Sequence, residues 1–363
     1  MTNSPHHFLK LLFVSTPVGP LGTGLGGGVE LSLYNIAQEL SRRGHTIQVV
    51  APQGSTLAAI PLVEIHGSLQ TIAQSQERTD PITMPGDSVL ANMWEYVRQV
   101  QADYDLIINF AYDWLPFYLT PFFTRPITHL VSMGSLSEAM DRIIAQVAAQ
   151  FPGTVGFHTP SQAATFAINQ ECPYLWNGID LSLYQFCPQP QPWLAWLGRI
   201  APEKGLEDAV AAAKIANVPL KIMGKIQDQN YWQQICQDYP DAPIEYLGFL
   251  PTTAELQQEL RLSRALLMTP HWIEAFGNVA IEALACGVPV IAYRRGGPGE
   301  IVQDGKTGFL VEPDSVAGLV EAIARLDEID RYACRQQAET EYSLKASGDR
   351  FETWFQRIVI PPS

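Results

Sequence analysis

The chain has 363 residues, more than one hydrophobic core usually holds and enough for two domains of ordinary size. Apolar residues make up 47%, aromatic residues 10% and charged residues only 17%, which excludes a largely disordered protein. The 23 Lys and Arg against 37 Asp and Glu give a formal net charge of −14, which excludes a broad cationic surface for duplex nucleic acid or anionic lipid but allows a local basic pocket.

The first half of the chain alternates between apolar runs and helical patterns. Residues 9–15 form a continuous apolar run, typical of a buried parallel strand, and a segment rich in Gly and Pro over residues 16–28 follows it. Residues 29–43 place apolar side chains at helical spacing, and Gly44 stands where a helix usually ends. The same alternation predicts strands at residues 46–51, 106–110, 127–132 and 154–158, and helices at residues 88–100 and 136–150. This alternation is typical of a doubly wound α/β domain.

A turn-rich stretch over residues 177–192 has the proline density and polarity of a linker, and we expect the hinge between two domains there. The alternation then restarts. It predicts strands at residues 194–197, 220–223, 244–247, 265–268 and 289–292, and helices at residues 206–216, 230–238, 254–263, 279–285 and from 315 onward. We therefore expect an α/β protein of two Rossmann-like domains, residues 1–184 and 185–342, with the tail over residues 343–363 packing back on the first domain.

The cysteines and the N-terminus indicate the compartment. The five cysteines are odd in number and scattered without a C-x-x-C pair, which predicts a reducing compartment and no structural zinc: Cys172, Cys187, Cys236, Cys286 and Cys334. The apolar run at residues 8–14 is too short for a signal sequence, and no run approaches the roughly 18 apolar residues of a membrane span. We expect a soluble, cytoplasmic protein without a transmembrane segment.

The glycine-rich loop after the first strand formally matches a dinucleotide-binding fingerprint at Gly22, Gly24 and Gly27. The fingerprint needs its first glycine directly after the strand and an acidic residue at the end of the second strand, and this chain has neither. NAD or FAD binding is therefore disfavoured. Gly26, Gly27 and Gly28 still precede the predicted helix, where amides and the helix dipole favour an anion. A loop without a binding role is the alternative.

Two cations, Arg199 and Lys204, follow the first strand of the second domain. Ligands of open α/β sheets lie at the carboxyl ends of strands, so we expect both side chains to reach the crevice between the domains. A planar guanidinium and a compact ammonium together suit a diphosphate. Two solvated surface cations are the alternative, which the position at a strand end disfavours.

Two glutamates, Glu274 and Glu282, form the third candidate group. Gly277 and Asn278 are typical of a helix start and Gly287 of its end, which places Glu274 in a loop and Glu282 on a short helix. Carboxylates accept paired hydrogen bonds from sugar hydroxyls, and the backbone amides at the helix start favour an anion. A solvated helix face is the alternative for Glu282, but its neighbours on the helix are apolar.

These motifs, in this order, resemble the retaining nucleotide-sugar glycosyltransferases of the GT-B fold, specifically glycosyltransferase family 4. The resemblance covers nearly the whole chain, through residues 27–30, 113–115, 177–180, 198–199 and 203–205, and it is strongest at residues 274–277, 282–292, 296–297 and 300–302. It implies two doubly wound domains facing across an interdomain cleft, with the acceptor bound by the first domain and the donor by the second.

The resemblance also implies a role for each candidate residue. Arg199 and Lys204 would hold the donor diphosphate, Glu282 its ribose hydroxyls and Glu274 the transferred sugar, so that Arg199, Lys204 and Glu274 act in catalysis. The departing phosphate would accept the proton of the acceptor on the same face, which keeps the anomeric configuration and agrees with cations aimed at the charge that grows there. Neither a cofactor nor a metal is implied. Backbone contacts to the donor are implied for Phe276, Gly277, Asn278 and Val279, with Gly27 and Gly28 closing the phosphate site from the first domain.

The chain departs from the family at a histidine motif. His129 matches the first position of a His-x-x-His-Gly pattern, but the second histidine is missing, so we assign no catalytic histidine and expect His129 to be a packed core residue. Asp103 and Asp105 form a D-x-D motif, which precedes its strand instead of following it. A solvated turn is therefore the better interpretation, and no metal site is expected.

The first domain is expected to bind the acceptor through residues in the long first loop and at strand ends: Pro17, Gly19, Tyr112, Asp113, Ser132 and Met133. Aromatic and small residues favour a flat organic acceptor over a long polyanion. The long first loop together with residues 130–135 is similar to the cyanobacterial pterin α-glucosyltransferases, which attach glucose from UDP-glucose to tetrahydrobiopterin. Another small acceptor, a lipid or an oligosaccharide remains open.

The leading hypothesis is therefore a retaining transferase that uses a small-molecule donor, UDP-glucose, and a small-molecule acceptor, without nucleic acid as a partner. A nucleotide-sugar epimerase is a rival, but it needs an acid/base pair that the sequence does not offer. A dinucleotide-dependent oxidoreductase is weakened by the missing ribose acid, and a non-catalytic binder by the intact set of cations and acids. The sequence does not indicate the oligomeric state.

Overall fold

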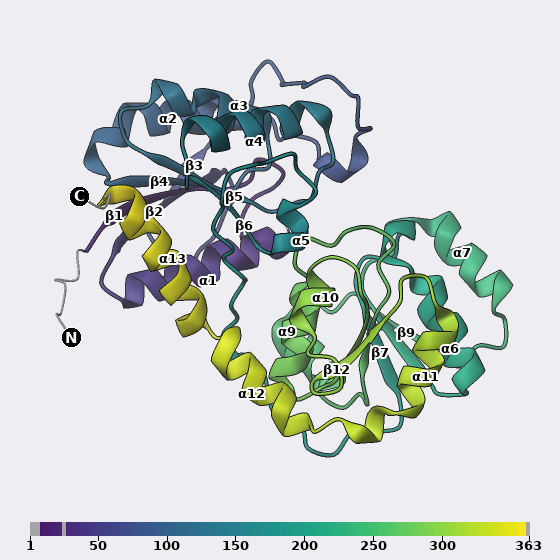
Figure 1. The fold of residues 1–363 in the computed structure, drawn as a ribbon. Coiled ribbons are helices and arrows are strands. Elements are labelled where there is room, and N and C mark those ends of the chain that lie inside the picture. The colour runs from purple at the N-terminus through teal and green to yellow at the C-terminus, as the bar shows by residue number, and fades with distance from the viewer. Residues whose placement is uncertain (1–7, 24–26, 361–363) are drawn as a thin grey trace. The chain divides into compact units, whose positions relative to one another are not determined.

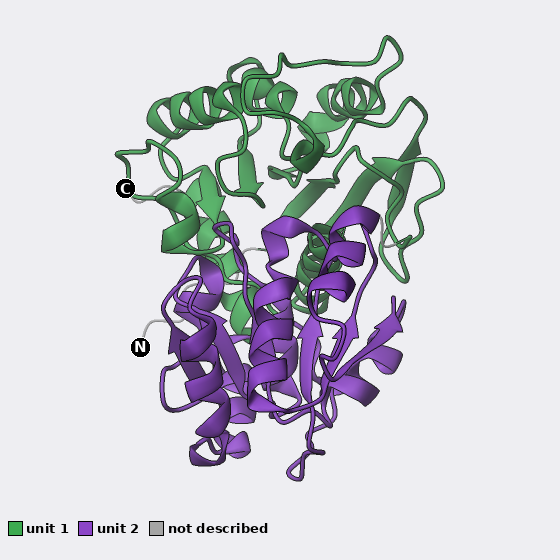
Figure 2. Ribbon diagram, turned by 90° about the vertical axis from the view of Figure 1, so that its right-hand side faces the viewer, with its two compact units in different colours: residues 1–178, 344–363 green, residues 179–343 purple. Residues whose placement is uncertain are grey.

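The computed structural model describes residues 8–23 and 27–360. The chain divides into two compact units, one formed by residues 1–178 with residues 344–363 and the other by residues 179–343 (Figure 2). The predicted limits were residues 1–184 and 185–342, with residues 343–363 as a returning tail. Each unit is an α/β structure with its own parallel sheet.

The first unit contains a six-stranded parallel sheet with the strand order β3-β2-β1-β4-β5-β6. The order reverses between β1 and β4, which pair in parallel. Such a switch point leaves a crevice at the carboxyl ends of the strands. The strands are β1 (Lys10–Val14), β2 (Thr46–Pro52), β3 (Leu62–Ile65), β4 (Leu106–Asn109), β5 (Ile127–Val131) and β6 (Val155–Phe157).

Helices cover both faces of this sheet because successive strand side chains point to opposite sides. Leu11 and Phe13 of β1 pack with the helices α1 and α13, whereas Leu12 and Val14 pack with α2. Figure 1 shows α2, α3 and α4 on one side of the sheet and α1 with α13 on the other. The helices are α1 (Gly28–Arg42), α2 (Val89–Val100), α3 (Trp114–Leu119), α4 (Glu138–Gln150), α5 (Pro160–Ala163) and α13 (Leu344–Val359).

The C-terminal helix α13 completes the first unit, and a buried charge network fixes it on α1. The Arg43 guanidinium donates to Glu39 and to Glu352, each at 2.8 Å, and also pairs with Asp349 at 2.8 Å. Glu352 also accepts from His45 at 3.2 Å if the ring carries the proton on that nitrogen. The side chain of Arg43 is 14% exposed, so these contacts are shielded from water and matter more than surface pairs do.

The second unit contains a six-stranded parallel sheet with the order β12-β11-β10-β7-β8-β9, and its switch point lies between β7 and β10. Its strands are β7 (Leu194–Leu197), β8 (Leu220–Met223), β9 (Ile244–Gly248), β10 (Leu266–Met268), β11 (Val290–Tyr293) and β12 (Gly308–Val311). Its helices are α6 (Leu206–Ala216), α7 (Gln229–Asp238), α8 (Thr253–Leu260), α9 (Asn278–Ala285), α10 (Gly297–Ile301), α11 (Val316–Ala324) and α12 (Arg331–Glu341). Both units thus have the strand order of a classic Rossmann sheet.

Most predicted elements are confirmed, and the differences lie at edges and ends. The prediction omitted the edge strands β3 and β12, the short helices α3, α5 and α10, and the longer helices α12 and α13. The helix predicted to run to residue 263 ends at Leu260, where a turn follows. In the described part of the chain, none of the helices combines the length and the apolar composition needed to cross a membrane.

The packing of α13 predicts a stability effect at Trp354. This side chain is 4% exposed, and its indole N–H donates to the carbonyl oxygen of Gly153 at 2.6 Å. We expect Trp354→Ala to lower the free energy of unfolding of the first unit by about 3–5 kcal/mol, because it leaves a cavity and an unpaired carbonyl. Chemical unfolding followed by circular dichroism measures the change. Tyr332→Ala on α12, where the ring is 64% exposed, is the control and should stay within about 0.5 kcal/mol of the parent; an equal effect of both variants would contradict the packing of α13.

Candidate functional site

The candidate donor residues of the second unit lie at the carboxyl ends of its two central strands. Arg199 and Lys204 follow β7, and Glu274 follows β10, the strand across the switch point. This is the edge at which open α/β sheets bind ligands. The chain order of strands and loops therefore brings residues about 70 positions apart to one place in the unit.

Lys204 and Glu274 form an ion pair at this edge. Both side chains are 18% exposed, and the indole N–H of Trp272 donates to the same carboxylate oxygen at 3.1 Å. The Lys204 ammonium also lies 4.8 Å from the centre of the Trp272 ring, within cation–π range. Burial would raise the pKa of Glu274, but Lys204, Trp272 and Arg199 outweigh it and lower that pKa, so the carboxylate stays ionised.

Arg199 is the more exposed of the two cations. Its guanidinium contacts Glu203 at 3.1 Å and donates to the side-chain oxygen of Gln227, and its side chain is 34% exposed. A guanidinium has five N–H donors in a planar fork, so donors remain for an oxyanion. Arg199 also helps to lower the pKa of Glu274, through its positive charge.

Two close backbone approaches fix the ion pair. Gly205 has φ +62°, and a Cβ there would lie 1.9 Å from the carbonyl oxygen of Thr269, so only glycine fits. The Thr269 hydroxyl donates to the carbonyl of Gly205 at 2.6 Å, which joins the loop after β10 to the segment of Lys204. On the other side, the amide of Gly297 donates to the carbonyl of Glu274 at 2.8 Å. The backbone on both sides therefore positions the two charged side chains.

Glu282 lies on α9, the helix that follows the loop of Glu274. Its side chain is buried, at 7% exposure, and it accepts a hydrogen bond from the Tyr184 hydroxyl at 3.2 Å. Burial raises the pKa of Glu282 to about 7, against the opposing effect of the Tyr184 bond. These observations exclude a solvated helix face for Glu282. Among the described residues its hydrogen bond is to Tyr184, and it forms neither a hydrogen bond nor an ion pair with Arg199, Lys204 or Glu274.

The start of α9 follows the Glu274 loop, as predicted. Gly277 precedes the helix with φ +94°, and Phe276 before it is buried, at 3% exposure. Asn278 is the first helical residue, and Asn278 and Val279 are both half-buried. The backbone suits an oxyanion at this end by the general preference of helix N-termini.

In the first unit, only part of the predicted glycine loop lies within the described residues. Gly27 precedes α1 with φ +61° and Gly28 is its first residue, and both are exposed. Gly22 packs its backbone against Thr56, where a Cβ would lie 2.7 Å from the carbonyl oxygen, so its role is local folding. Gly24 and Gly26 lie outside the described residues.

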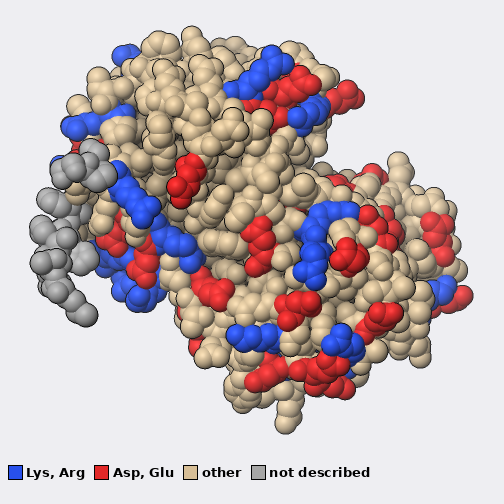
Figure 3. All heavy atoms as spheres, viewed as in Figure 1, with Lys and Arg blue, Asp and Glu red and all other residues tan. Residues whose placement is uncertain are grey.

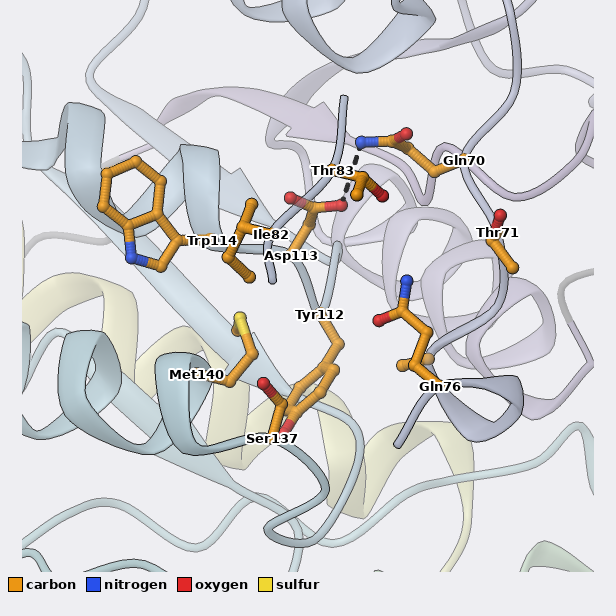
Figure 4. A pocket seen from close by; sticks show the side chains of 11 residues that line it. Gln70, Thr71, Gln76, Ile82, Thr83, Tyr112, Asp113, Trp114, Ser137 and Met140 are labelled. Carbon is orange, nitrogen blue, oxygen red and sulfur yellow. Dashed lines mark hydrogen bonds between the residues drawn. The ribbon is translucent and has the colours of Figure 1, made fainter. Parts of the chain in front are cut away.

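A pocket in the first unit brings two of the predicted acceptor residues, Tyr112 and Asp113, to one wall (Figure 4). The pocket is partly open to solvent. The segment between β3 and α2 supplies the opposite wall, which sequence reasoning missed, although the length of that connection was a signal. The lining residues are Gln70, Thr71, Ala73, Gln76, Ile82, Thr83, Tyr112, Asp113, Trp114, Ser137 and Met140.

The other predicted acceptor residues do not line this pocket. The carbonyl of Pro17 accepts from the amide of Gln70 at 3.0 Å, and the sulfur of Met133 accepts from the side chain of Gln74 at 3.2 Å. These two residues therefore support the segment that lines the pocket. Gly19 is buried and Ser132 half-buried, and neither is among the lining residues.

His129 is a core residue, as the sequence predicted. It is fully buried on β5, stacks on Phe117 with ring centres 4.1 Å apart, and lies within hydrogen-bonding distance of Asn109 and Thr120. Burial lowers the pKa of His129 to about 3. A neutral, enclosed ring of this kind supports the sheet and is shielded from any ligand.

The acidic motif before β4 has a local role at Asp105. Its carboxylate accepts from the amide of Lys10 at 2.8 Å, and Asp103 belongs to a turn of 3-10 helix ahead of the strand. Among the described residues, the group whose ligand atoms lie close enough to hold a metal is a different one: Asp208, His271 and Asp314. Arg295 pairs with Asp314 at 2.7 Å and the Tyr293 hydroxyl donates to Asp208 at 2.6 Å. Protein groups therefore already satisfy both carboxylates.

Figure 3 shows how charged side chains are distributed on one face of the molecule. On the face shown in Figure 3, Lys and Arg side chains lie among Asp and Glu, and large areas carry neither. A local grouping of cations is found instead at the Arg199 and Lys204 positions described above.

Comparison with known proteins agrees with this architecture. Residues 187–341 match the family model described as "Glycosyl transferases group 1", which covers most of the second unit. The chain is 26% identical to a glycogen synthase of Mycobacterium tuberculosis over 87% of this chain and 85% of that protein. It is 24% identical to a D-inositol 3-phosphate glycosyltransferase of Mycolicibacterium smegmatis over 95% of this chain and 88% of that protein.

A solved structure shows the same fold. The Anabaena protein HepE, in complex with UDP and glucose, superposes with a TM-score of 0.74 at 20% identity, covering 95% of this chain and 98% of that one. The two parallel six-stranded sheets and this neighbour establish the GT-B fold. The comparisons thus show a GT-B fold and a second unit that is similar to the glycosyl transferases of group 1.

The burial of Glu282 predicts a pH-dependent stability. Its folded pKa of about 7 lies above its ordinary value of 4.5, so the parent loses stability as the pH rises from about 4.5 through about 7. The loss is at most roughly 3 kcal/mol. We expect Glu282→Gln to be more stable than the parent near pH 8 and about equal near pH 4.5, as chemical unfolding at the two pH values would measure.

Glu95→Gln is the matched control for this measurement. Glu95 is paired with Arg98, which lowers its pKa to about 2, so its replacement brings no gain at high pH. A Glu282→Gln variant whose stability follows the parent at every pH would contradict the raised pKa.

Proposed function

We propose that this protein of GT-B fold is a group 1 glycosyltransferase, a retaining enzyme that transfers glucose from UDP-glucose to a small organic acceptor. The observation that supports it most is the ion pair of Lys204 and Glu274 beside Arg199, at the switch point of the second sheet. Two cations suit a diphosphate, and a carboxylate held ionised beside them suits the hydroxyls of the sugar. The neighbour HepE, whose structure holds UDP and glucose, motivates the choice of donor.

In this proposal each charged side chain has one task. Arg199 and Lys204 bind the diphosphate and stabilise the negative charge that grows on it as the sugar departs. Glu274 accepts hydrogen bonds from the sugar, and the backbone at Phe276, Gly277, Asn278 and Val279 contacts the donor at the start of α9. Glu282 binds the ribose hydroxyls. Gly27 and Gly28 at the start of α1 are further anion-binding backbone in the same proposal.

Retention of configuration is proposed to depend on the donor phosphate itself. The oxygen of the acceptor hydroxyl attacks the anomeric carbon on the side from which the diphosphate leaves. A phosphate oxygen of the leaving diphosphate accepts the proton of that hydroxyl. The α configuration is kept because attack and departure share one face. Glu274 is engaged by Lys204 and Trp272, which suits a binding carboxylate better than a free nucleophile.

The acceptor is proposed to be a pterin such as tetrahydrobiopterin, bound in the first unit beside Tyr112 and Asp113. A mixed polar and apolar pocket of this kind suits a flat organic ring. A lipid or an oligosaccharide acceptor is the alternative, and the similarity to a glycogen synthase favours the oligosaccharide of the two. The enzyme is further proposed to be cytoplasmic and to need neither a metal nor a cofactor.

One experiment tests the proposed function. The purified protein is incubated with UDP-glucose and a panel of reduced pterins, phenols and lipids, with and without EDTA, and UDP release, product mass and the anomeric proton signal are recorded. We expect UDP release with a reduced pterin, an α-glucoside product and equal rates in EDTA. A β-glucoside would exclude retention, loss of activity in EDTA would exclude metal independence, and a product with lipids alone would exclude the pterin.

Replacement of Arg199 tests the phosphate-binding role. We expect Arg199→Ala to lower kcat by about 10²-fold or more, because the leaving diphosphate loses a charge-assisted donor in the transition state. Steady-state kinetics on the acceptor found above measure the effect. Arg325→Ala is the control, because Arg325 pairs with Glu328 on the surface of the same unit, and its kcat should stay at the parent value. Turnover of Arg199→Ala within a factor of two of the parent would remove Arg199 from the site.

A further inference from the structure

The pocket of the first unit contains a carboxylate with weak partners. Asp113 precedes α3, and its two oxygens accept from the Leu115 amide at 3.4 Å and from the Gln70 side chain at 3.3 Å. Both distances are longer than an ordinary N–H···O bond of roughly 2.7–3.2 Å. In the described part of the chain, Asp113 has no ion pair with Lys or Arg. The Trp114 amide is a third neutral donor to this carboxylate. Two carboxylate oxygens have about four acceptor sites, so Asp113 keeps accepting capacity for a ligand.

Burial adds a second property to this carboxylate. It raises the pKa of Asp113, while the bonds from Leu115, Trp114 and Gln70 act in the opposite direction. The Tyr112 hydroxyl beside it stays protonated, because burial raises the pKa of Tyr112 to about 12. This hydroxyl accepts a hydrogen bond from the amide of Leu136 at 3.3 Å. Asp113 is therefore the titratable group of the pocket whose ionised form a bound cationic or N–H-rich edge would stabilise most.

The other lining residues of the pocket are of two chemical kinds, apolar side chains and neutral hydrogen-bonding side chains. Figure 4 shows Met140 and Gln76 on opposite sides of the pocket, with Asp113 above and Tyr112 below. Apolar surface comes from Ile82, Trp114 and Met140, and neutral hydrogen-bonding groups come from Gln70, Thr71, Gln76, Thr83 and Ser137. Amides and hydroxyls both donate and accept, so they suit a ring bearing carbonyl and imine nitrogen atoms.

The segment that forms the far wall is fixed on the rest of the unit. The Arg78 guanidinium donates to Asp141 at 2.6 Å and to the Ser135 hydroxyl at 2.8 Å, and the carbonyl of Arg78 accepts from the amide of Glu138 at 3.1 Å. These bonds attach the segment to the start of α4. Gln70 and Gln76 are thereby held opposite Asp113 and form one preorganised pocket.

We propose that Asp113 is the specificity-determining residue of the acceptor site, where its carboxylate accepts two neighbouring N–H groups from the edge of a planar, nitrogen-rich ring. The ring lies against Met140 and Tyr112, and the amides of Gln70 and Gln76 bond its other polar atoms. This inference rests on the proposed function for the ring's role as acceptor. Its own content is the chemical class, a cyclic amidine or guanidine edge, which a phenol, a sugar or a lipid chain does not present.

The two oxygens of a carboxylate match two parallel N–H donors on adjacent atoms of a ring, the same geometry that guanidinium groups use. A ring that presents a carbonyl at that edge instead sets oxygen against oxygen and leaves the carboxylate unsatisfied. Sites built on such a match reject the mismatched analogue strongly. The pocket should therefore discriminate between rings of identical shape that differ in one substituent.

The test compares two such rings. Pterin carries an amino group beside a ring N–H, and lumazine has a carbonyl in place of that amino group. Equilibrium binding of each is measured by calorimetry, with and without UDP, on the parent and on Asp113→Asn, which keeps a side chain that is favourable before a helix. We expect the parent to bind pterin roughly 10- to 100-fold more tightly than lumazine, and Asp113→Asn to remove that preference.

Two controls separate recognition from folding. Asp330→Asn replaces the residue that caps α12 in the second unit, where the carboxylate accepts from the Tyr332 amide, and it should leave both ring affinities unchanged. The affinity of Asp113→Asn for UDP should equal that of the parent, since its donor residues are intact.

The outcomes are distinct. If the parent binds both rings equally or neither, or if Asp113→Asn keeps the preference for pterin, the role of Asp113 is wrong whatever the enzyme's reaction. If UDP does not bind, or if UDP-glucose is not consumed with any acceptor, the proposed function fails, while the ring preference of Asp113 is still decided by the same calorimetry.

Discussion

The ion pair of Lys204 and Glu274 is the contact on which the candidate donor site depends. It joins the loops after β7 and β10, the two strands that flank the switch point, and it is shielded by Trp272. Removal of either partner would leave a charge in a partly desolvated place, which costs far more than an exposed pair returns. Gly205 lets the backbone lie against Thr269, and Gly296 lets it lie against Glu274, because a Cβ at either position would collide with that residue. The position of the charges is therefore a property of the sheet topology as much as of the side chains.

The two glutamates of the second unit illustrate how one side chain acquires two different properties. Glu274 remains ionised because a cation and an indole donor compensate for its burial, whereas Glu282 has a single phenol donor and a pKa of about 7. Ionisation of Glu282 therefore costs free energy unless a bound molecule offers hydroxyl groups to the carboxylate. A buried acid that is poorly satisfied in the unliganded protein is expected where a ligand supplies the missing bonds. The two glutamates therefore differ in their pKa values because their local partners differ.

The sequence predicted the second unit closely, because glycines, prolines and short apolar runs mark the ends of its parallel strands. Arg199, Lys204 and Glu274 could be assigned to one edge by the rule for strand ends alone. The rule could not separate Glu282 from them, since the direction of a helical side chain depends on packing against Tyr184. The pocket beside Asp113 was half predicted. Its other wall comes from an irregular connection in which no periodicity places Gln70 or Gln76, and their position opposite Asp113 follows only from long-range bonds such as those of Arg78.

The return of the chain to the first unit through α13 has a consequence for biosynthesis. Trp354 and Phe355 fill a core whose other members, among them Leu11 and Leu33, emerge from the ribosome more than three hundred residues earlier. Until α13 is synthesised, the core of the first unit lacks Trp354 and Phe355. The second unit is one continuous stretch, and all its strands are synthesised before α13. Domains usually fold as units in order of synthesis. The second unit can therefore complete its core before the first unit, whose core needs the residues of α13.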